Sequence, residues 1–150
     1  MAKRQSLQAQ AKQVFESEML REKAGDCPDA NSTYAFNICY GNQVTITDQN
    51  LKNYESTIQE LMAPIPRMPG NSADNMPEQA VPSLAPQQVL EEFDHLEEVW
   101  RQYRETACSA AYHEFHGGTG GPSFQMEWQL KLARDHMREL DMVYGSDLHL

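Results

Sequence analysis

The chain has little positive charge and few cysteines. Its 150 residues include 12 Lys and Arg against 22 Asp and Glu, which gives a formal net charge of −10. Because nucleic-acid binding requires a basic surface, this balance argues against a nucleic-acid partner. The same charge would suit a basic macromolecule, although it serves solubility equally well.

The sequence also lacks a long apolar run. No stretch of about 18 apolar residues is present, so no membrane span is predicted. The start, MAKRQSLQAQAKQ, has basic residues without an apolar segment behind them, which is not the form of an intact signal peptide. Two options follow: a cytoplasmic protein, or a numbering that begins on a processed form.

Proline is concentrated in one internal segment. Six of the eight prolines lie between Pro64 and Pro86, where helices and sheet ladders are both disfavoured. We therefore expect a long loop over residues 63–86, acting as a linker or as a recognition loop laid over the surface.

Apolar residues on either side of this segment recur at helical spacing. The stripe that follows it comprises Val89, Phe93, Leu96, Trp100, Tyr103, Ala107 and Ala111, with Glu97 among the polar residues off the stripe. After a glycine-rich turn, a second stripe comprises Met126, Leu130, Ala133, Met137, Leu140 and Tyr144. Gly145 stands where a helix C-cap is expected.

The amino-terminal half has two further helical patterns. Leu7, Ala11, Val14 and Phe15 mark the first, which should close near Gly25 and Pro28. The second should begin between Asn31 and Thr33, each of which can cap a helix, and run to about Leu61. It includes the β-branched patch at residues 41–47, which is read as helix because no partner strand is available.

These patterns predict an all-α fold, a small four-helix bundle with the Pro-rich loop between helices 2 and 3. We expect a single domain over residues 1–150, built from helical hairpins at about 4–62 and 87–144.

Several short motifs resemble one known family. The segment WRQYRETAC, the glycine turn after it and the helix ending ARDHMREL are similar to the carboxyl-terminal half of the lysozyme inhibitor LprI N-terminal-like family. The segment DCPDANSTYAFNIC resembles that family's first conserved segment. The residues that match as structural positions of the motif are Trp100, Tyr103, Arg104, Cys108 and Asp48. The resemblance covers about Asp26 to Leu140, apart from the Pro-rich segment.

The resemblance implies a small helical, extracytoplasmic bacterial protein from a family named after a member reported to inhibit lysozyme. It also implies a disulfide between Cys27 and Cys39, which would place the protein in an oxidising compartment. The alternative is two separate buried thiols in a cytoplasmic protein. In the family Cys108 commonly has a bridge partner, whose position is occupied here by Trp128.

Cys108, His113 and His116 are close enough in sequence to be considered as a catalytic or zinc site. A cysteine nucleophile needs a neighbouring imidazole and a third, orienting group, whereas Cys108 lies beside the apolar stripe, as a buried and inert sulfur would. Zinc needs a fourth ligand or an open water position. We therefore expect no catalytic residue, no metal and no cofactor. The candidate partner-binding loop comprises His113, His116, Gly117, Gly118 and Thr119.

Taken together, the sequence predicts a non-enzymatic protein that binds a protein partner. The specific hypothesis is an inhibitor or immunity-type module against a cell-wall-degrading enzyme such as lysozyme. One alternative is a metal-binding or hydrolytic protein centred on Cys108, His113 and His116, and another is a helical adaptor or scaffold. The expected location is periplasmic or secreted, with a lipid-anchored precursor as a variant and the cytoplasm as the alternative.

Overall fold

The structure is a computed structural model that describes residues 2–63 and 85–149. The described part of the chain is helical and contains no strand, which confirms the predicted all-α bundle. Its helices are α1 (Ala2–Ala24), α2 (Thr33–Met62), α3 (Pro86–Glu114), α4 (Gly121–Val143) and the short α5 (Gly145–Leu148). The Pro-rich loop predicted over 63–86 lies outside the described residues, apart from its two ends.

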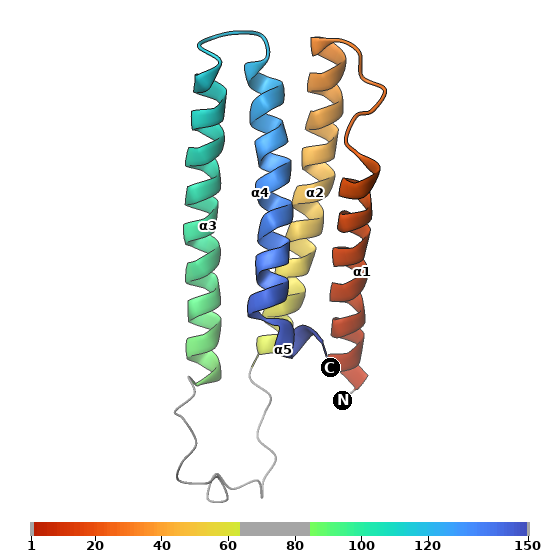
Figure 1. The fold of residues 1–150 in the computed structure, drawn as a ribbon. Helices are drawn as coiled ribbons and strands as arrows, with labels where there is room; N and C mark the ends of the chain where they lie inside the picture. Colours follow the sequence, from red (N-terminus) through yellow and green to blue (C-terminus); the bar gives the residue numbers. More distant parts are fainter. Residues whose placement is uncertain (1, 64–84, 150) are drawn as a thin grey trace, which may run out of the picture.

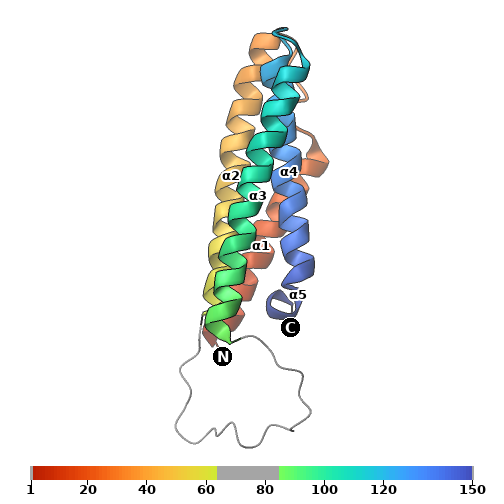
Figure 2. The same ribbon diagram turned by 90° about the vertical axis from the view of Figure 1, so that its left-hand side faces the viewer.

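The four long helices lie side by side along one axis (Figures 1 and 2). In Figure 1 their order across the molecule is α3, α4, α2 and α1. Helix α4 packs extensively on both α2 and α3, and α1 packs mainly on α2, so α1 and α3 form the two edges. Both chain ends and α5 lie at one end. The start of α2 and the α3–α4 turn lie at the other, which we call the distal end.

Local signals account for the helix boundaries. The Ser32 hydroxyl accepts a hydrogen bond from the backbone N–H of Ala35 at 3.1 Å and caps α2, as predicted. The patch 41–47 lies within α2, which confirms its helical interpretation. Gly145 does not act as a left-handed C-cap: α4 ends at Val143, the N–H of its cap residue Tyr144 bonds to the carbonyl of Leu140, and Gly145 begins α5. That expectation was wrong because the chain continues into another helical turn.

The core forms where α1, α2, α3 and α4 meet. Its fully buried side chains include Tyr54, Ile58, Phe93, Met137 and Leu140, and the Phe93 ring packs edge-on against Tyr144 at 5.4 Å. The hydroxyl of Tyr54 donates to Asp141 at 3.3 Å, so this buried polar group is satisfied. No helix in the described ranges is long and apolar enough to cross a membrane.

The buried face of α3 differs from the predicted stripe. Leu96 and Tyr103 are 37% and 59% exposed, whereas Glu97, which the pattern predicts on the solvent side, is only 2% exposed. Because α3 is an edge helix that contacts mainly α4, only a narrow arc of its surface turns inward. That arc follows the four-three-four spacing of Phe93, Glu97, Trp100 and Arg104.

A disulfide joins Cys27, in the α1–α2 loop, to Cys39 in α2, and Cys108 is a buried free thiol. Cys27 and Gly25 both have positive φ values, 56° and 88°, where the chain leaves α1 and reverses. The bridge therefore ties a strained loop back onto the helix that follows it.

Replacing both bridge cysteines, as Cys27→Ser/Cys39→Ser, should lower the free energy of unfolding by about 3 kcal/mol, because a 12-residue separation is no longer closed in the unfolded chain. Urea denaturation measures this change. A reductant should lower the stability of the natural protein by the same amount and leave the double variant unchanged. If fully reduced natural protein keeps its full stability, the bridge contributes nothing.

Candidate protein-binding surface

A buried charged network joins α1, α2 and α4. Glu18 of α1 is 0% exposed and accepts a hydrogen bond from Nε of Arg134 at 2.8 Å. The two terminal nitrogens of Arg134 donate to both carboxylate oxygens of Asp26 at 2.6 and 2.9 Å, the bidentate geometry that guanidinium and carboxylate favour. Thr47 and Asn50 of α2 each donate to Glu18 at 2.9 Å. Asp26 lies in the α1–α2 loop, directly before Cys27, so its hydrogen bonds with Arg134 attach this loop to α4.

The pKa values of this network follow from its hydrogen bonds. Burial alone would raise the pKa of Glu18, but the hydrogen bonds from Arg134, Asn50 and Thr47 outweigh burial and lower the pKa below its ordinary value of 4.5. Burial would likewise lower the pKa of Arg134, but hydrogen bonds to Asp26 and Glu18 raise it. Both groups are therefore held in their charged forms.

The α3–α4 turn at the distal end reverses the chain through two left-handed residues. His116 and Gly117 have φ values of 48° and 81°. Gly118 donates its N–H to the carbonyl of Phe115 at 2.8 Å, and a Cβ at Gly118 would stand 3.0 Å from that same oxygen. The glycines are thus explained by the turn. The predicted loop residues are all exposed here: His113, His116, Gly117, Gly118 and Thr119.

Large apolar side chains are exposed around this turn. Tyr34 is 76% exposed at the start of α2, and Ile38, Tyr112 and Phe115 are also exposed. A hydrogen bond of 2.5 Å from Ser123 to Asn37 ties the start of α4 to the start of α2, so the two helices present their exposed residues at the same end. We call the distal surface the set Tyr34, Ile38, Tyr112, Phe115 and the exposed residues 113–119.

The distal part of the bundle has no lysine or arginine. Residues 24–51 and 105–130 contain neither, and their carboxylates are Asp26, Asp29, Asp48, Glu105, Glu114 and Glu127. Asp26 and Asp48 are paired with arginines, whereas the other four acids are exposed. The negative charge of the chain is therefore unbalanced at the end that carries the distal surface.

The structure does not bring Cys108, His113 and His116 together as a site. Cys108 is buried, and burial raises the pKa of its thiol, an effect that Arg104 opposes and Asp48 reinforces. Both histidines are exposed, and in the described ranges neither is hydrogen-bonded to Cys108 or grouped with it as a metal ligand. A buried thiol with a raised pKa is a poor nucleophile.

The motif residues of α3 divide between the interior and the surface. Arg104 donates to Asp48 at 2.7 Å and to the carbonyl of Gln129 at 2.8 Å, and its guanidinium lies 5.4 Å from the centre of the Trp100 ring. These contacts link α2, α3 and α4. Tyr103 instead faces solvent, beside a groove of about 390 Å³ between α3 and α4.

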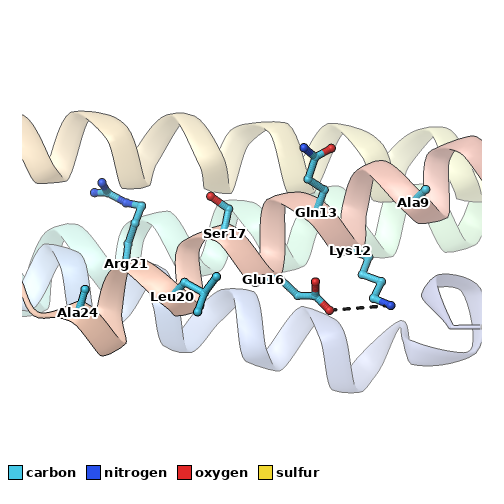
Figure 3. Close-up of a pocket in the computed structure, with 8 residues that line it drawn as sticks. All are labelled: Ala9, Lys12, Gln13, Glu16, Ser17, Leu20, Arg21 and Ala24. Carbon is cyan, nitrogen blue, oxygen red and sulfur yellow. Dashed lines mark ion pairs between the residues drawn. The ribbon is translucent and has the colours of Figure 1, made fainter.

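One surface hollow is formed by α1 alone. This hollow, shown in Figure 3, lies along a single face of α1, from Ala9 to Ala24, and includes the Lys12–Glu16 ion pair at 3.9 Å. Since one helix supplies every lining residue, this hollow is an exposed helix face and not a cleft that encloses a small molecule.

Four buried ionisable residues were missed by the sequence reasoning: Glu18, Glu97, Arg134 and His136. The signal for Glu18 was present, because it continues the three-four spacing of the Ala11 and Val14 stripe. Arg134 and His136 flank the buried stripe of α4 and become buried because α4 is covered on two sides.

These features define an all-α, disulfide-containing helical bundle. The family model described as lysozyme inhibitor LprI matches residues 25–140, so the chain belongs to the lysozyme inhibitor LprI family. Searches of curated proteins and of solved structures gave no match. The resemblance inferred from the motifs is thereby confirmed.

Glu18→Gln should lower the free energy of unfolding at neutral pH by about 3 kcal/mol, because Arg134 loses a buried charged partner. Since the folded-state pKa of Glu18 is depressed, its contribution is present above about pH 4.5 and is lost as pH falls through the folded pKa. Urea denaturation between about pH 7 and pH 3 should therefore show a shallower acid dependence for this variant.

The matched control is Glu16→Gln, on the same helix but exposed, which should keep both the stability and the acid dependence of the natural protein. An unchanged acid dependence in Glu18→Gln would show that Glu18 does not control acid stability.

Proposed function

We propose that this protein binds and inhibits a lysozyme or a related cell-wall-degrading enzyme, using the distal surface. The observation that carries the proposal is the family match, which spans residues 25–140 and so includes every residue of the distal surface. The protein partner follows from the family, whereas the choice of surface follows from the exposure and charge described above.

The composition of the distal surface supports a protein partner. Protein interfaces are enriched in aromatic side chains at their centres, and Tyr34, Tyr112 and Phe115 supply three that are already exposed. They lie on the ends of packed helices and on a turn whose backbone is constrained by hydrogen bonds, so little conformational entropy would be lost on binding.

Charge supports a basic partner in particular. The exposed acids Asp29, Glu105, Glu114 and Glu127 lie in segments without lysine or arginine, so the distal part of the bundle would attract a cationic enzyme. Complementary charge increases association rates, and the effect declines as salt screens it. Basic lysozymes are therefore the preferred targets.

The proposed role is non-enzymatic and extracytoplasmic. The open hollow along α1 and the buried Cys108 thiol, whose pKa is raised by burial, support binding over catalysis. The Cys27–Cys39 disulfide supports an oxidising compartment such as the periplasm or the exterior of the cell. We also propose that residues 1–150 form a single domain, as expected from the sequence.

Excess protein should suppress the activity of a basic lysozyme on a cell-wall suspension, and Phe115→Ala or Tyr34→Ala should weaken inhibition by about tenfold or more, as expected for an exposed aromatic anchor. The matched control is Met142→Ala, which removes a side chain that is 84% exposed at the opposite end of α4. Full lysozyme activity at saturating protein would refute the proposal, and equal losses in the control variant would refute the choice of surface.

A paired charge experiment tests the electrostatic part. Glu114→Gln/Glu127→Gln should slow association with lysozyme and flatten its salt dependence, whereas Glu91→Gln/Glu98→Gln, on the other half of α3, should do neither. Stopped-flow association rates at several salt concentrations measure both quantities. Identical rates for the two variants would remove charge steering from the proposal.

A further inference from the structure

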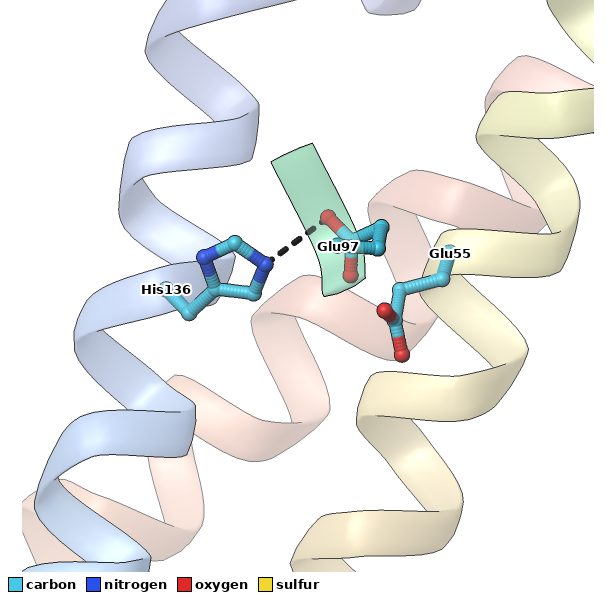
Figure 4. A group of neighbouring side chains, drawn as sticks. All are labelled: Glu55, Glu97 and His136. Carbon is cyan, nitrogen blue, oxygen red and sulfur yellow. Dashed lines mark hydrogen bonds and ion pairs between the residues drawn. The ribbon is translucent and has the colours of Figure 1, made fainter. Parts of the chain in front are cut away.

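Three side chains with metal-ligand chemistry meet between α2, α3 and α4 (Figure 4). They are Glu55, Glu97 and His136, and their ligand atoms all lie within 4.8 Å of one another. Nε2 of His136 lies 2.8 Å from Oε1 of Glu97. Glu97 and His136 are 2% and 1% exposed, and Glu55 is half-buried.

Two carboxylate oxygens of this cluster have no partner among the described residues. Oε2 of Glu55 and Oε2 of Glu97 are both buried, and neither has a hydrogen-bond partner in the described part of the chain. No lysine or arginine in those ranges forms an ion pair with either carboxylate. A buried carboxylate is strongly disfavoured unless it is paired, and two that lie this close also repel each other.

The other buried acid of the bundle provides an internal comparison. Both oxygens of Glu18 are used, by Arg134, Arg21, Thr47 and Asn50. The same bundle therefore satisfies a buried carboxylate fully in one place and leaves two carboxylate oxygens open in the other. The cluster also contains a histidine, which is a metal ligand in its own right.

We propose that Glu55, Glu97 and His136 bind a divalent transition-metal ion, with Zn²⁺ as the best match. One imidazole nitrogen and two carboxylates are a donor set that zinc accepts, with water in the fourth position. Ligand atoms around tetrahedral zinc stand about 3.3 Å apart, and rotation of the half-buried Glu55 side chain would bring ligand atoms that already lie within 4.8 Å of one another to this spacing. This proposal departs from the expectation from the sequence, which includes no metal.

The surroundings of His136 suit a ligand. Its Nδ1 lies 3.5 Å from Oε2 of Glu139, and an outer carboxylate of this kind orients a ligating imidazole. The ring stacks on Trp100 with centres 4.1 Å apart and planes 8° apart, which holds it in one plane. The groove between Leu96 and Leu132 is also lined by His136 and offers a path from solvent.

The ion would act as a structural cross-link. Each ligand comes from a different helix, and α3 packs only lightly on α2. Metal binding would therefore attach the edge helix α3 to α2 through Glu97 and Glu55. The proposal does not depend on the proposed inhibition of lysozyme, because the cluster contains no residue of the distal surface.

The test uses full-length, tag-free protein treated with a chelator and then titrated with Zn²⁺ by calorimetry. One equivalent should bind, and the melting temperature should rise with zinc concentration because the ion binds only the folded chain. Glu97→Gln keeps the size of the side chain but removes its charge, and it should weaken zinc binding by more than about 100-fold. Glu91→Gln, an exposed position on the same helix, should bind zinc as the natural protein does.

Two further variants keep the proposal testable. Glu55→Gln alters a half-buried ligand and should also abolish stoichiometric binding, even if Glu97→Gln fails to fold. His113→Asn/His116→Asn removes the exposed histidines of the turn and should leave binding intact. The proposal is overturned if the natural protein binds no stoichiometric zinc, if both glutamine variants retain binding, or if binding is lost in the histidine variant.

Discussion

The Arg134 guanidinium connects α4 both to α1 and to the α1–α2 loop. It lies on α4 and donates hydrogen bonds to Glu18 of α1 and to Asp26 of the α1–α2 loop. Thr47 and Asn50 of α2 also donate hydrogen bonds to Glu18. Asp26 adjoins the bridged Cys27, so the position of the loop depends on the network. A charged group this deeply buried is tolerated only with its partners in place, which makes the arrangement of α1, α2 and α4 specific.

Glu97 is the second buried acid of the bundle, and the hydrogen bonding of its carboxylate is incomplete within the described ranges. In the described part of the chain, Glu97 is hydrogen-bonded to His136, while its Oε2 and the Oε2 of Glu55 have no partner. Glu97 is buried as deeply as Glu18, so its charge needs hydrogen-bond or ionic partners to the same extent. A proton can neutralise one of the two carboxylates, whereas a divalent ion can neutralise both and engage the imidazole as well. The interior of this small bundle thus contains one buried carboxylate whose two oxygens are both hydrogen-bonded, and a second whose Oε2 has no partner among the described residues.

The distal surface lies apart from the buried arginine contacts. The arginines that support the bundle lie outside residues 24–51 and 105–130, so the distal end retains exposed acids, aromatic side chains and a glycine turn. Membership of the lysozyme inhibitor LprI family makes a protein partner the natural interpretation of that end.

Helix type and extent were readable from the sequence because each long helix carries apolar residues at a three-four spacing, with a capping serine before α2 and a proline at the start of α3. The short motifs around Cys27 and Trp100 were sufficient to place the chain in its family. The buried roles of Glu97, Arg134 and His136 were not readable, and Tyr103 was wrongly placed in the core. Sequence periodicity identifies a face but not how much of it a neighbour covers, and only the tertiary packing of α4 between α2 and α3 decided which charged side chains lost their contact with water.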